Sequence, residues 1–204
     1  MIDEAVIREA MDALAAVDPD VAKGRELVGD PEPRIRPHGF ETLLRIIVSQ
    51  QISTYAAAAI MARVEERMGD RTAESFLALN DEALRNCGLS ARKVEYARGI
   101  AEAIARRQLD LPSLRIKPDD EVIMELSALK GIGVWSAEIY AMFSLGRTDI
   151  FPADDLALQE ALKRLKRMRK RPTAVIARKK ITKWKPWRSV GALFLWHYYK
   201  GAPQ

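Results

Sequence analysis

Cysteine and histidine are scarce in this sequence, which has 204 residues, one cysteine (Cys87) and two histidines (His38 and His197). A single cysteine excludes an intramolecular disulfide bond, and it excludes a zinc site or an iron–sulfur cluster held by several thiolates. A metal enzyme built on soft ligands is therefore not expected. We interpret Cys87 as a buried packing residue, because unpaired cysteine behaves as a small apolar side chain.

Long apolar runs are missing as well. No stretch approaches the roughly 18 apolar residues from which a membrane-spanning helix is recognised. The opening residues, MIDEAVIREA, are acidic and amphipathic, unlike a signal peptide. The composition, with 48% hydrophobic and 30% charged residues, is ordinary for a folded domain. We therefore expect a cytoplasmic protein that makes no contact with a membrane.

Positive charge is unevenly distributed along the chain. The formal net charge is +5, residues 1–32 are acidic overall, and lysine and arginine are concentrated in residues 163–188. A cluster of this kind suits the binding of a polyanion such as nucleic acid. A solvated helix face would have the same composition, so charge alone leaves both interpretations open.

Apolar residues recur at helical spacing almost throughout, and no segment alternates convincingly with the period of a strand. These patterns predict an all-α fold with about ten helices. The first helix is expected at residues 2–16, and a loop rich in proline and charge is expected at 29–39. Side chains suited to capping a helix N-terminus precede four later helices: Ser53, Asn80, Ser90 and Asp154.

Proline marks two further helix starts near the C-terminus. Pro172 and Thr173 are expected to begin a helix that continues to Lys183. Pro186 fits the first turn of the last helix, where the missing N–H of proline would have no intrahelical partner in any case.

The segment LKGIGVWSA (129–137) joins two amphipathic helices through two glycines that flank one apolar residue. Glycine permits a very tight turn and lets another backbone approach closely. The N–H groups at the start of the second helix would then face outward and form a site for a phosphate. A plain helix-joining turn would contain the same residues, and the glycines alone do not separate the two interpretations.

Two adjacent carboxylates, Asp154 and Asp155, stand at the start of a helix in the segment FPADDLALQEAL (151–162). The helix dipole and the unpaired N–H groups favour negative charge at that end of a helix. One aspartate can cap the helix while the other projects elsewhere. Both residues could also be caps with no further role.

Aromatic side chains gather among lysines and arginines near the C-terminus: Trp184, Trp187, Trp196, Tyr198 and Tyr199. Aromatic rings interleaved with cations can stack on nucleic-acid bases. In a small domain, tryptophan also commonly belongs to the core, and this alternative stays open.

Taken in order, these motifs resemble the helix-hairpin-helix (HhH-GPD) DNA glycosylase superfamily, and within it the DNA-3-methyladenine glycosylase II family. In that superfamily a hairpin with glycines is followed by a Gly/Pro-rich loop and an aspartate. The order and spacing of four stretches make the resemblance more specific than any one motif. The stretches are FETLLRIIVSQQISTYAAA (40–58), LSARKVEYARGIA (89–101), LKGIGVWSAEIY…FPADDLAL (129–158) and WKPWRSVGALFLWHYY (184–199).

The resemblance implies an all-α fold of two lobes with a DNA-binding cleft between them, in a compact form without the N-terminal β-domain of some members. The expected lobes are residues 1–35 together with 120–204, and residues 36–119. The implied partner is double-stranded DNA that contains a damaged base, bound by a monomer.

The resemblance also assigns the residues of the active site. Asp155 is implied to be the catalytic carboxylate, with Asp154 left to cap the helix and support it. Trp135 and Trp196 are implied to line the base pocket. Ile139 occupies a pocket position at which some close relatives have an aromatic residue, so the pocket is expected to be less aromatic here.

The implied DNA-binding residues lie in two segments. Gln51 and Ile52 stand where the family inserts a wedge into the duplex. The hairpin is expected to hold a DNA phosphate through Lys130, Gly131, Ile132, Gly133 and Ser136, with lysine at position 130 where many relatives have proline. The backbone carbonyls of Leu129 and Gly131 are expected to bind a monovalent cation, Na⁺ or K⁺, and no other cofactor is required.

The implied reaction is the excision of an alkylated purine such as 3-methyladenine or 7-methylguanine. Such a base is positively charged, which attracts it to aromatic faces and makes it a good leaving group. Trp135 stands where bifunctional members carry a catalytic lysine, so an abasic site without strand cleavage is expected. Two alternatives stay open, a glycosylase for oxidised or mismatched bases and a non-catalytic DNA-binding module.

Overall fold

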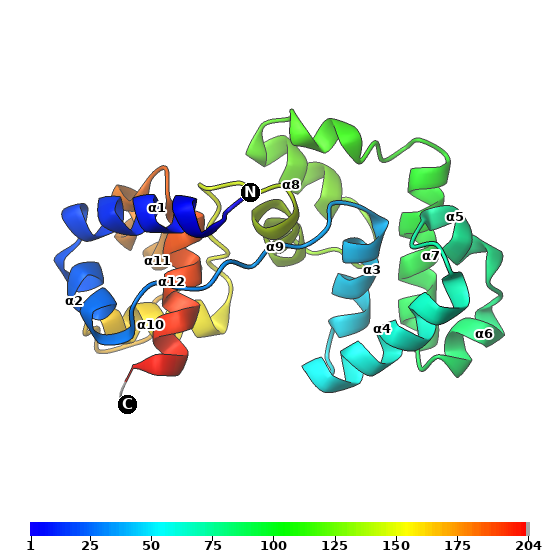
Figure 1. Cartoon of the computed structure of the whole chain (residues 1–204), viewed down its shortest axis with the longest axis horizontal. Coiled ribbons are helices and arrows are strands. Elements are labelled where there is room, and N and C mark those ends of the chain that lie inside the picture. Colours follow the sequence, from blue (N-terminus) through cyan, green and yellow to red (C-terminus); the bar gives the residue numbers. More distant parts are fainter. Residues whose placement is uncertain (203–204) are drawn as a thin grey trace. The chain divides into compact units, whose positions relative to one another are not determined.

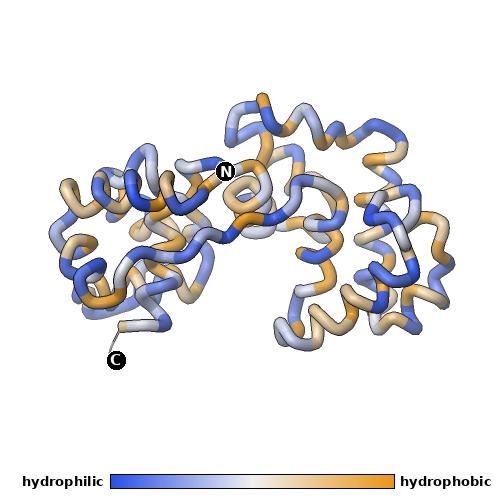
Figure 2. Tube along the Cα trace, in the orientation of Figure 1, coloured by the Kyte–Doolittle hydropathy of each residue, from blue (hydrophilic) through white to orange (hydrophobic). Residues whose placement is uncertain are grey.

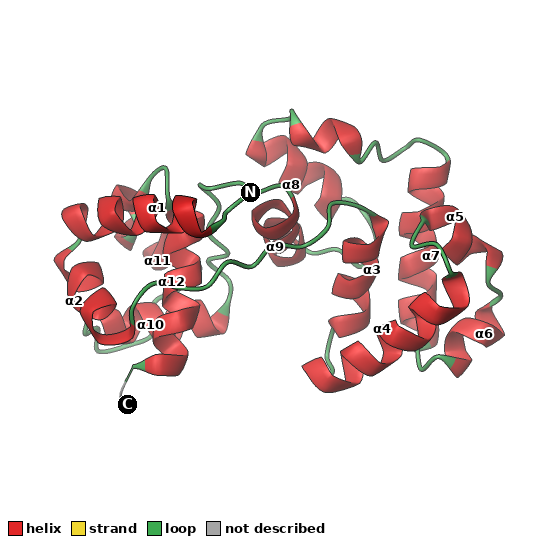
Figure 3. Ribbon diagram, in the orientation of Figure 1, coloured by secondary structure: helices red, strands yellow, loops and turns green. Residues whose placement is uncertain are grey.

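The computed structural model describes residues 1–202, which form helices joined by loops (Figures 1 and 3). The described part contains no β-strand, which confirms the predicted all-α class. No helix in this part is both long and apolar enough to cross a membrane. Residues 203 and 204, the last two of the expected terminal lobe, lie outside the described part.

The chain divides into two compact units, the first comprising Met1–Ile35 and Ala141–Gln204. Apolar and polar residues alternate along its helices, as the colours of Figure 2 show, and within it both α1 and α10 pack against α12. The helices that lie wholly in this unit are α1 (Glu4–Val17), α2 (Pro19–Val28), α10 (Leu156–Leu165), α11 (Ala174–Lys180) and α12 (Arg188–Gly201), with the short 3₁₀ helix η2 (Thr182–Trp184).

The second unit is Arg36–Tyr140. Its most buried helix is α3, which packs against both α4 and α7, while α5 covers another part of α7. The helices that lie wholly in this unit are α3 (Phe40–Ser49), α4 (Thr54–Met68), α5 (Ala73–Ala78), α6 (Asp81–Asn86), α7 (Ala91–Ala105), η1 (Pro112–Arg115) and α8 (Asp119–Ser127).

The boundary between the units falls inside α9 (Val134–Ser144), because Tyr140 belongs to the second unit and Ala141 to the first. The boundary expected between residues 119 and 120 is therefore corrected, since α8 and the hairpin after it belong to the second unit. The physical reason is that the hairpin is bonded there. The side-chain amide of Gln50 donates to the Gly131 carbonyl over 2.8 Å.

Helix N-termini expected from capping residues are confirmed at Ser53, Asn80 and Ser90. Each side chain accepts a hydrogen bond from the backbone N–H three residues later, over 3.2, 2.8 and 3.4 Å respectively. Gly69 ends α4 with a φ of 69°, a conformation that glycine adopts without steric cost. These helix ends depend on hydrogen bonds between residues within about one turn, so the sequence is sufficient to predict them.

The helix α2 was not expected, although Asp18 and Pro19 mark its start. Asp18 accepts a hydrogen bond from the Asp20 N–H over 3.2 Å, and Pro19 occupies the first turn. The same carboxylate is 6% exposed, and it accepts from Lys166 Nζ over 2.6 Å and from Trp184 Nε1 over 2.8 Å. Asp18 therefore joins α2, the end of α10 and η2 in the core of the first unit.

The helix expected from Pro172 to Lys183 is shorter than predicted, since α11 ends at Lys180. The hydroxyl of Thr182 donates to the Lys179 carbonyl over 2.9 Å. A hydroxyl that bonds to backbone carbonyls in this way competes with continued helix formation. The chain then continues as η2.

Pro186 lies before α12 and not in its first turn, so this expectation was wrong. The Trp187 N–H donates to the Trp184 carbonyl over 2.6 Å, which closes a turn ahead of the helix. Regular α-helix begins only at Arg188.

Candidate functional site

Asp155 lies at the N-terminus of α10 in the first unit. Its Oδ1 accepts a hydrogen bond from the Leu158 N–H over 2.9 Å and another from Trp196 Nε1, on α12, over 3.4 Å. The first bond caps the helix, and the second links the carboxylate to an aromatic ring. The structure thus brings together two of the residues that the resemblance assigns to the active site.

Asp154 was expected to cap α10, and this expectation is corrected because Asp155 is the cap. The Asp155 N–H donates to the Pro152 carbonyl over 3.0 Å, and this turn leaves Asp155 with the extended backbone (φ −69°, ψ 118°) that a cap residue requires. The Asp154 side chain is 63% exposed, and its Oδ2 lies 3.8 Å from the Arg178 guanidinium. One residue, Asp155, therefore serves as helix cap and as candidate catalytic group.

Trp196 is 8% exposed, and two side chains lie against its ring. The Phe143 ring is tilted by 50° with its centroid 6.0 Å away, and the guanidinium carbon of Arg34 lies 5.4 Å from the ring centroid. The second distance is within the range of a cation–π interaction. Trp184 is fully buried, and its Nε1 donates to Asp18 instead. The two tryptophans therefore bond to different aspartates.

The segment that leads to Asp155 is fixed by the start of α12. Arg188 makes a bidentate ion pair with Asp149, with distances of 2.6 and 2.9 Å. The buried hydroxyl of Ser189 accepts from the Ile150 N–H over 2.9 Å and donates to the Ile150 carbonyl over 3.0 Å. Sequence reasoning did not single out Arg188 or Ser189. The available signal was a polar Arg-Ser pair at the start of an otherwise apolar helix.

The hairpin in the second unit needs glycine at one of its two glycine positions. Gly131 has a φ of 94°, and a Cβ there would lie 2.4 Å from a ring carbon of Tyr96. Ile132 is 3% exposed and anchors the turn in the core. A Cβ at Gly133 would meet no such neighbour within 4 Å. The chain itself therefore leaves open space at Gly133, directly in front of α9.

Lys130, which was expected to contact DNA, forms an ion pair with Glu95 and lies over the ring of Tyr96, 5.9 Å from its centroid. Its side chain is 70% exposed. The hydrogen bond to Glu95 raises the pKa of Lys130 above its ordinary value. Because the pair is exposed, water and salt screen it, so the ammonium group remains available to another anion.

The loop after α3 is bonded to the hairpin and to α7. The Gln50 amide donates to the Gly131 carbonyl, as described above, and Lys93 Nζ donates to the Val48 carbonyl over 2.7 Å. Burial lowers the pKa of Lys93 below its ordinary value. The two segments expected to bind DNA are thus held together, through a glutamine that sequence reasoning did not select.

Gln51 and Ile52 lie at the tip of this loop. Gln51 has a φ of 58°, a left-handed conformation that is uncommon for residues other than glycine. Ile52 is 37% exposed, and Tyr55, one turn further along, is 86% exposed. The loop therefore presents apolar side chains to solvent. Tyr55 was not selected from the sequence, although an exposed aromatic side chain can stack on a nucleic-acid base.

Three residues of α9 were assigned to the base pocket or to DNA binding. Trp135 is 42% exposed, whereas Ser136 and Ile139 are buried. All three belong to the second unit, while Asp155 and Trp196 belong to the first. The pocket roles of Trp135 and Ile139, and the DNA contact of Ser136, stay predictions.

The basic cluster at 163–188 is partly neutralised within the first unit. Its ion pairs are Lys163 and Arg164 with Glu160, Lys166 with Asp18 and Asp20, Arg178 with Asp154, and Arg188 with Asp149. Five of the thirteen lysines and arginines in this segment therefore pair with a carboxylate. The net positive charge of this part of the surface is smaller than the composition of the segment alone indicates.

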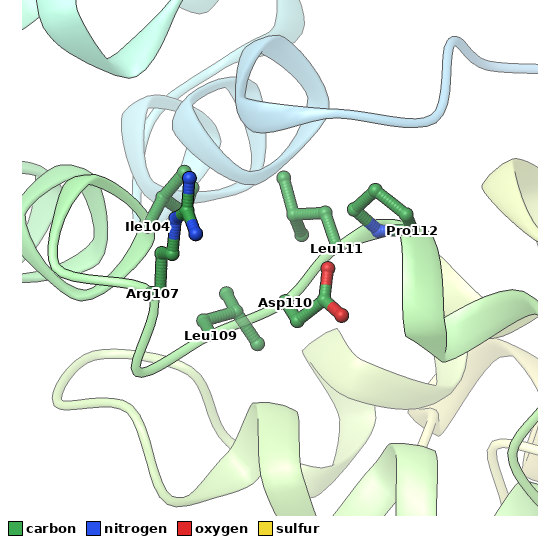
Figure 4. Close-up of a pocket in the computed structure, with 6 residues that line it drawn as sticks. All are labelled: Ile104, Arg107, Leu109, Asp110, Leu111 and Pro112. Carbon is green, nitrogen blue, oxygen red and sulfur yellow. The ribbon is translucent and has the colours of Figure 1, made fainter.

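A hollow of about 420 Å³ lies in the second unit, between the end of α7 and the segment that enters η1 (Figure 4). Its lining is mainly aliphatic, with the charged side chains of Arg107 and Asp110 among those labelled in the figure. None of the residues assigned to the candidate site lines this hollow. We assign no function to it.

The carbonyls of Leu129 and Gly131, where a monovalent cation is expected, each accept one hydrogen bond. The donors are the Ile132 N–H over 3.0 Å and the Gln50 amide over 2.8 Å. A carbonyl oxygen has two lone pairs, so each keeps one that could face a cation. The residues therefore fit the expected ion, which stays a prediction.

Comparison with known proteins relates this architecture to a family and to individual members. The family model for HhH-GPD superfamily base excision DNA repair protein matches residues 44–186. DNA-3-methyladenine glycosylase 1 of Schizosaccharomyces pombe is 32% identical to this chain over 190 residues, which are 90% of this chain and 83% of that protein.

Two solved structures are similar over nearly the whole chain. DNA-3-methyladenine glycosidase from Bacillus halodurans has a TM-score of 0.85 and 34% identity, covering 94% of this chain and 89% of that chain. The 3-methyladenine DNA glycosylase of Schizosaccharomyces pombe in complex with abasic DNA has a TM-score of 0.78 and 32% identity, covering 92% and 95% respectively.

Proposed function

Because this chain belongs to the HhH-GPD superfamily of base excision DNA repair proteins, we propose that it is a DNA-3-methyladenine glycosylase. The substrate is double-stranded DNA that contains an alkylated purine of the 3-methyladenine or 7-methylguanine type. The enzyme turns this nucleotide out of the duplex and hydrolyses its N-glycosidic bond, which leaves a free base and an abasic site. Trp135 replaces the lysine of bifunctional members, so the strand is not cut.

The observation that carries this proposal is the hydrogen bond from Trp196 to Asp155, which holds an aromatic ring beside a carboxylate. A positively charged alkylpurine is attracted to the face of an aromatic ring. The adjacent carboxylate can stabilise the positive charge that develops on the sugar as the glycosidic bond breaks. The two functions that the reaction needs therefore lie next to each other.

The charge of the base determines how much catalysis the protein has to supply. An alkylated purine is already a good leaving group, so a general acid of the kind used by sugar glycosidases is hardly needed. Asp155 stabilises the oxocarbenium-like sugar and orients the attacking water. The bonds from Leu158 and Trp196 fix the carboxylate before the reaction, so little reorganisation is required during it.

The elements proposed to bind DNA are in the second unit. The N–H groups at the start of α9 bind a phosphate in the open space at Gly133, because a helix N-terminus favours an anion. Gln51 and Ile52 enter the gap that the displaced nucleotide leaves. A monovalent cation on the carbonyls of Leu129 and Gly131 would add positive charge beside that phosphate. A monomeric state and a cytoplasmic location are part of the same proposal.

The test is the release of methylated bases from alkylated duplex DNA by the wild type, Asp155→Asn and Asp154→Asn. Asparagine is isosteric with aspartate and also caps helices, so Asp155→Asn should keep α10 intact while removing the charge. We expect its rate to fall by at least about a hundredfold with unchanged DNA affinity. Asp154→Asn is the matched control, and its rate should change by less than about twofold because the carboxylate is exposed.

Three other outcomes of this experiment would contradict different parts of the proposal. Undiminished release by Asp155→Asn would show that Asp155 is not catalytic. A wild type that binds duplex DNA but releases no methylated base would favour an oxidised or mismatched base as substrate, or a non-catalytic module. Strand nicking without added alkali would contradict monofunctional chemistry.

A further inference from the structure

Arg34 differs from Arg25 and Arg188, two other arginines of the first unit, in the group that it contacts. Arg25 and Arg188 form ion pairs with aspartates, whereas the guanidinium of Arg34 makes no ion pair or hydrogen bond with any described residue. It lies over the ring of Trp196 instead, 5.4 Å from the centroid. Arg34 is exposed and belongs to the segment after α2 that has no regular secondary structure (Figure 1).

Two side chains cover the ring of Trp196: Arg34 can move away from it, and Phe143 cannot. Phe143 is 4% exposed and is part of the core, so its displacement would open the first unit. Arg34 is exposed and is held only by the cation–π contact, which is a weak interaction at an exposed site. A base that stacks on Trp196 therefore has to replace Arg34.

A hollow beside Arg34 has room for its guanidinium group once that group leaves the ring. A hollow of about 290 Å³ is lined by Arg34, Glu32 and residues of α12 that include His197 and Lys200. Glu32 forms no ion pair with a described residue, and its carboxylate is two residues from Arg34 in the chain. The hollow thus offers Arg34 both space and an opposite charge.

We propose that Arg34 is a specificity-determining residue, which covers Trp196 in the free enzyme and gives way to a positively charged base. This inference rests on the proposed function, because it requires Trp196 to receive the base. Displacing Arg34 costs the same cation–π contact whichever base enters. A cationic base recovers this cost in its own contact with the ring, whereas a neutral base does not, so Arg34 lowers the population of the stacked state mainly for a neutral base. Selection for charged bases therefore comes from a cation of the protein as well as from the ring.

The test compares release of 7-methylguanine, which is charged in DNA, with release of hypoxanthine, which is neutral, from duplexes of one sequence under single-turnover conditions. Removal of the guanidinium in Arg34→Ala should raise the rate for hypoxanthine about two- to fivefold, the worth of an exposed cation–π contact. The rate for 7-methylguanine should change less. Arg34→Lys keeps a cation over the ring and should restore the preference of the wild type.

Arg8→Ala is the matched control, since Arg8 is an exposed arginine of α1 and its removal changes the net charge equally. The inference would be overturned if Arg34→Ala released hypoxanthine at the wild-type rate. It would also be overturned if Arg34→Ala raised the rates for both bases by the same factor, or if Arg8→Ala changed the selectivity as Arg34→Ala does. A wild type that releases neither 7-methylguanine nor 3-methyladenine would instead refute the proposed function, and this is seen before any variant is compared. If only 3-methyladenine is released, it takes the place of 7-methylguanine as the charged base.

Discussion

The two units fix their candidate site segments by different chemistry. In the first unit, ion pairs hold α10, which Asp155 caps, and α12, which contains Trp196. Asp18 pairs with Lys166 at the end of α10, and Asp149 pairs with Arg188 at the start of α12. Carboxylates that are buried or half-buried therefore hold the helices that contribute to the candidate site.

In the second unit, the corresponding bonds end on backbone carbonyls. Gln50 donates to the Gly131 carbonyl of the hairpin, and His38 Nε2 bonds to the Leu111 carbonyl over 2.9 Å. A carbonyl oxygen accepts only, so Nε2 of His38 carries a hydrogen, and in neutral histidine Nδ1 is then the acceptor. These bonds need a neutral histidine or an amide, and they need no ionised carboxylate.

Acid is therefore expected to weaken these two sets of bonds in different pH ranges. The ion pairs of Asp18 and Asp149 lose their stabilising effect as the carboxylates become protonated, below about pH 4. The bonds of neutral His38 lose stability as soon as the unfolded chain binds a proton, from about pH 6.5 downward. The bonds of His38 should be the first to respond.

Asp18→Asn should have the largest effect on stability, and it tests the contrast between the two units most directly. The substitution removes the buried partner of the Lys166 ammonium, whose side chain is 15% exposed, and leaves only the more exposed carboxylate of Asp20 as a counter-charge. We expect a loss of about 3 kcal/mol in the free energy of unfolding at neutral pH, measured by urea denaturation. Asp12→Asn is the control, because the Asp12 carboxylate is 67% exposed in its pair with Arg25. It should cost less than about 1 kcal/mol, and equal losses in both variants would contradict the assigned role of the Asp18 network.

The acid response of Asp18 follows from its surroundings. Burial alone would raise the pKa of Asp18, but the hydrogen bonds from Lys166 and Trp184 outweigh burial and hold that pKa below its ordinary value. The stabilisation is thus complete above the pKa of the unfolded chain, near pH 4, and it is lost as pH falls through the lower folded value. Asp18→Asn should therefore flatten the acid limb of the stability curve.

His38→Phe should have a smaller effect, confined to the second unit. Nδ1 of His38 accepts from the Tyr140 hydroxyl over 2.9 Å, and burial raises the pKa of Tyr140 to about 12, so this hydroxyl keeps its proton. Loss of this bond and of the bond to Leu111 should cost about 2 kcal/mol at neutral pH. Urea denaturation at pH 7 measures the loss.

The pH dependence of the same variant is the sharper test. Burial, followed by repulsion from Arg115, lowers the pKa of His38. Wild-type stability should therefore decline as pH falls below about 6.5, where the unfolded chain takes up a proton that the folded chain resists. His38→Phe should lack this decline, while His197→Phe, which retains His38, should keep it. A decline of equal slope in His38→Phe would show that another group is responsible.

The sequence predicted the features of the fold that depend on neighbouring residues. Ser53 and Asn80 cap helices as expected because a cap needs only the N–H group three residues later. Gly131 is required for two reasons, of which one, the tight turn, is local. The other is the ring of Tyr96, which comes from a distant part of the chain, and periodicity contains no information about it.

Features that depend on distant residues were missed or misassigned. The helix cap was assigned to Asp154, whereas the turn at Pro152 makes Asp155 the cap. Sequence patterns do not resolve an error of one residue. The contact of Arg34 with Trp196 joins opposite ends of the chain. The resemblance supplied the roles of individual residues, and these roles remain predictions that mutation has to test.

Gln50→Ala should have the smallest effect, and it sharpens the contrast between chemistry in the first unit and DNA binding in the second. Without the amide, the Gly131 carbonyl loses its bond to the neighbouring loop, and the N–H groups of the hairpin are less well fixed. We expect duplex affinity to weaken about two- to tenfold, the worth of one hydrogen bond, measured by fluorescence anisotropy at one salt concentration. Gln50→Glu should weaken affinity further, because an ionised carboxylate cannot donate to the carbonyl and adds negative charge near the phosphate. Base release at saturating enzyme should stay near the wild-type rate in both variants, the reverse of the result expected for Asp155→Asn. A loss of rate without a loss of affinity would mean that this contact positions the reacting nucleotide rather than the DNA backbone.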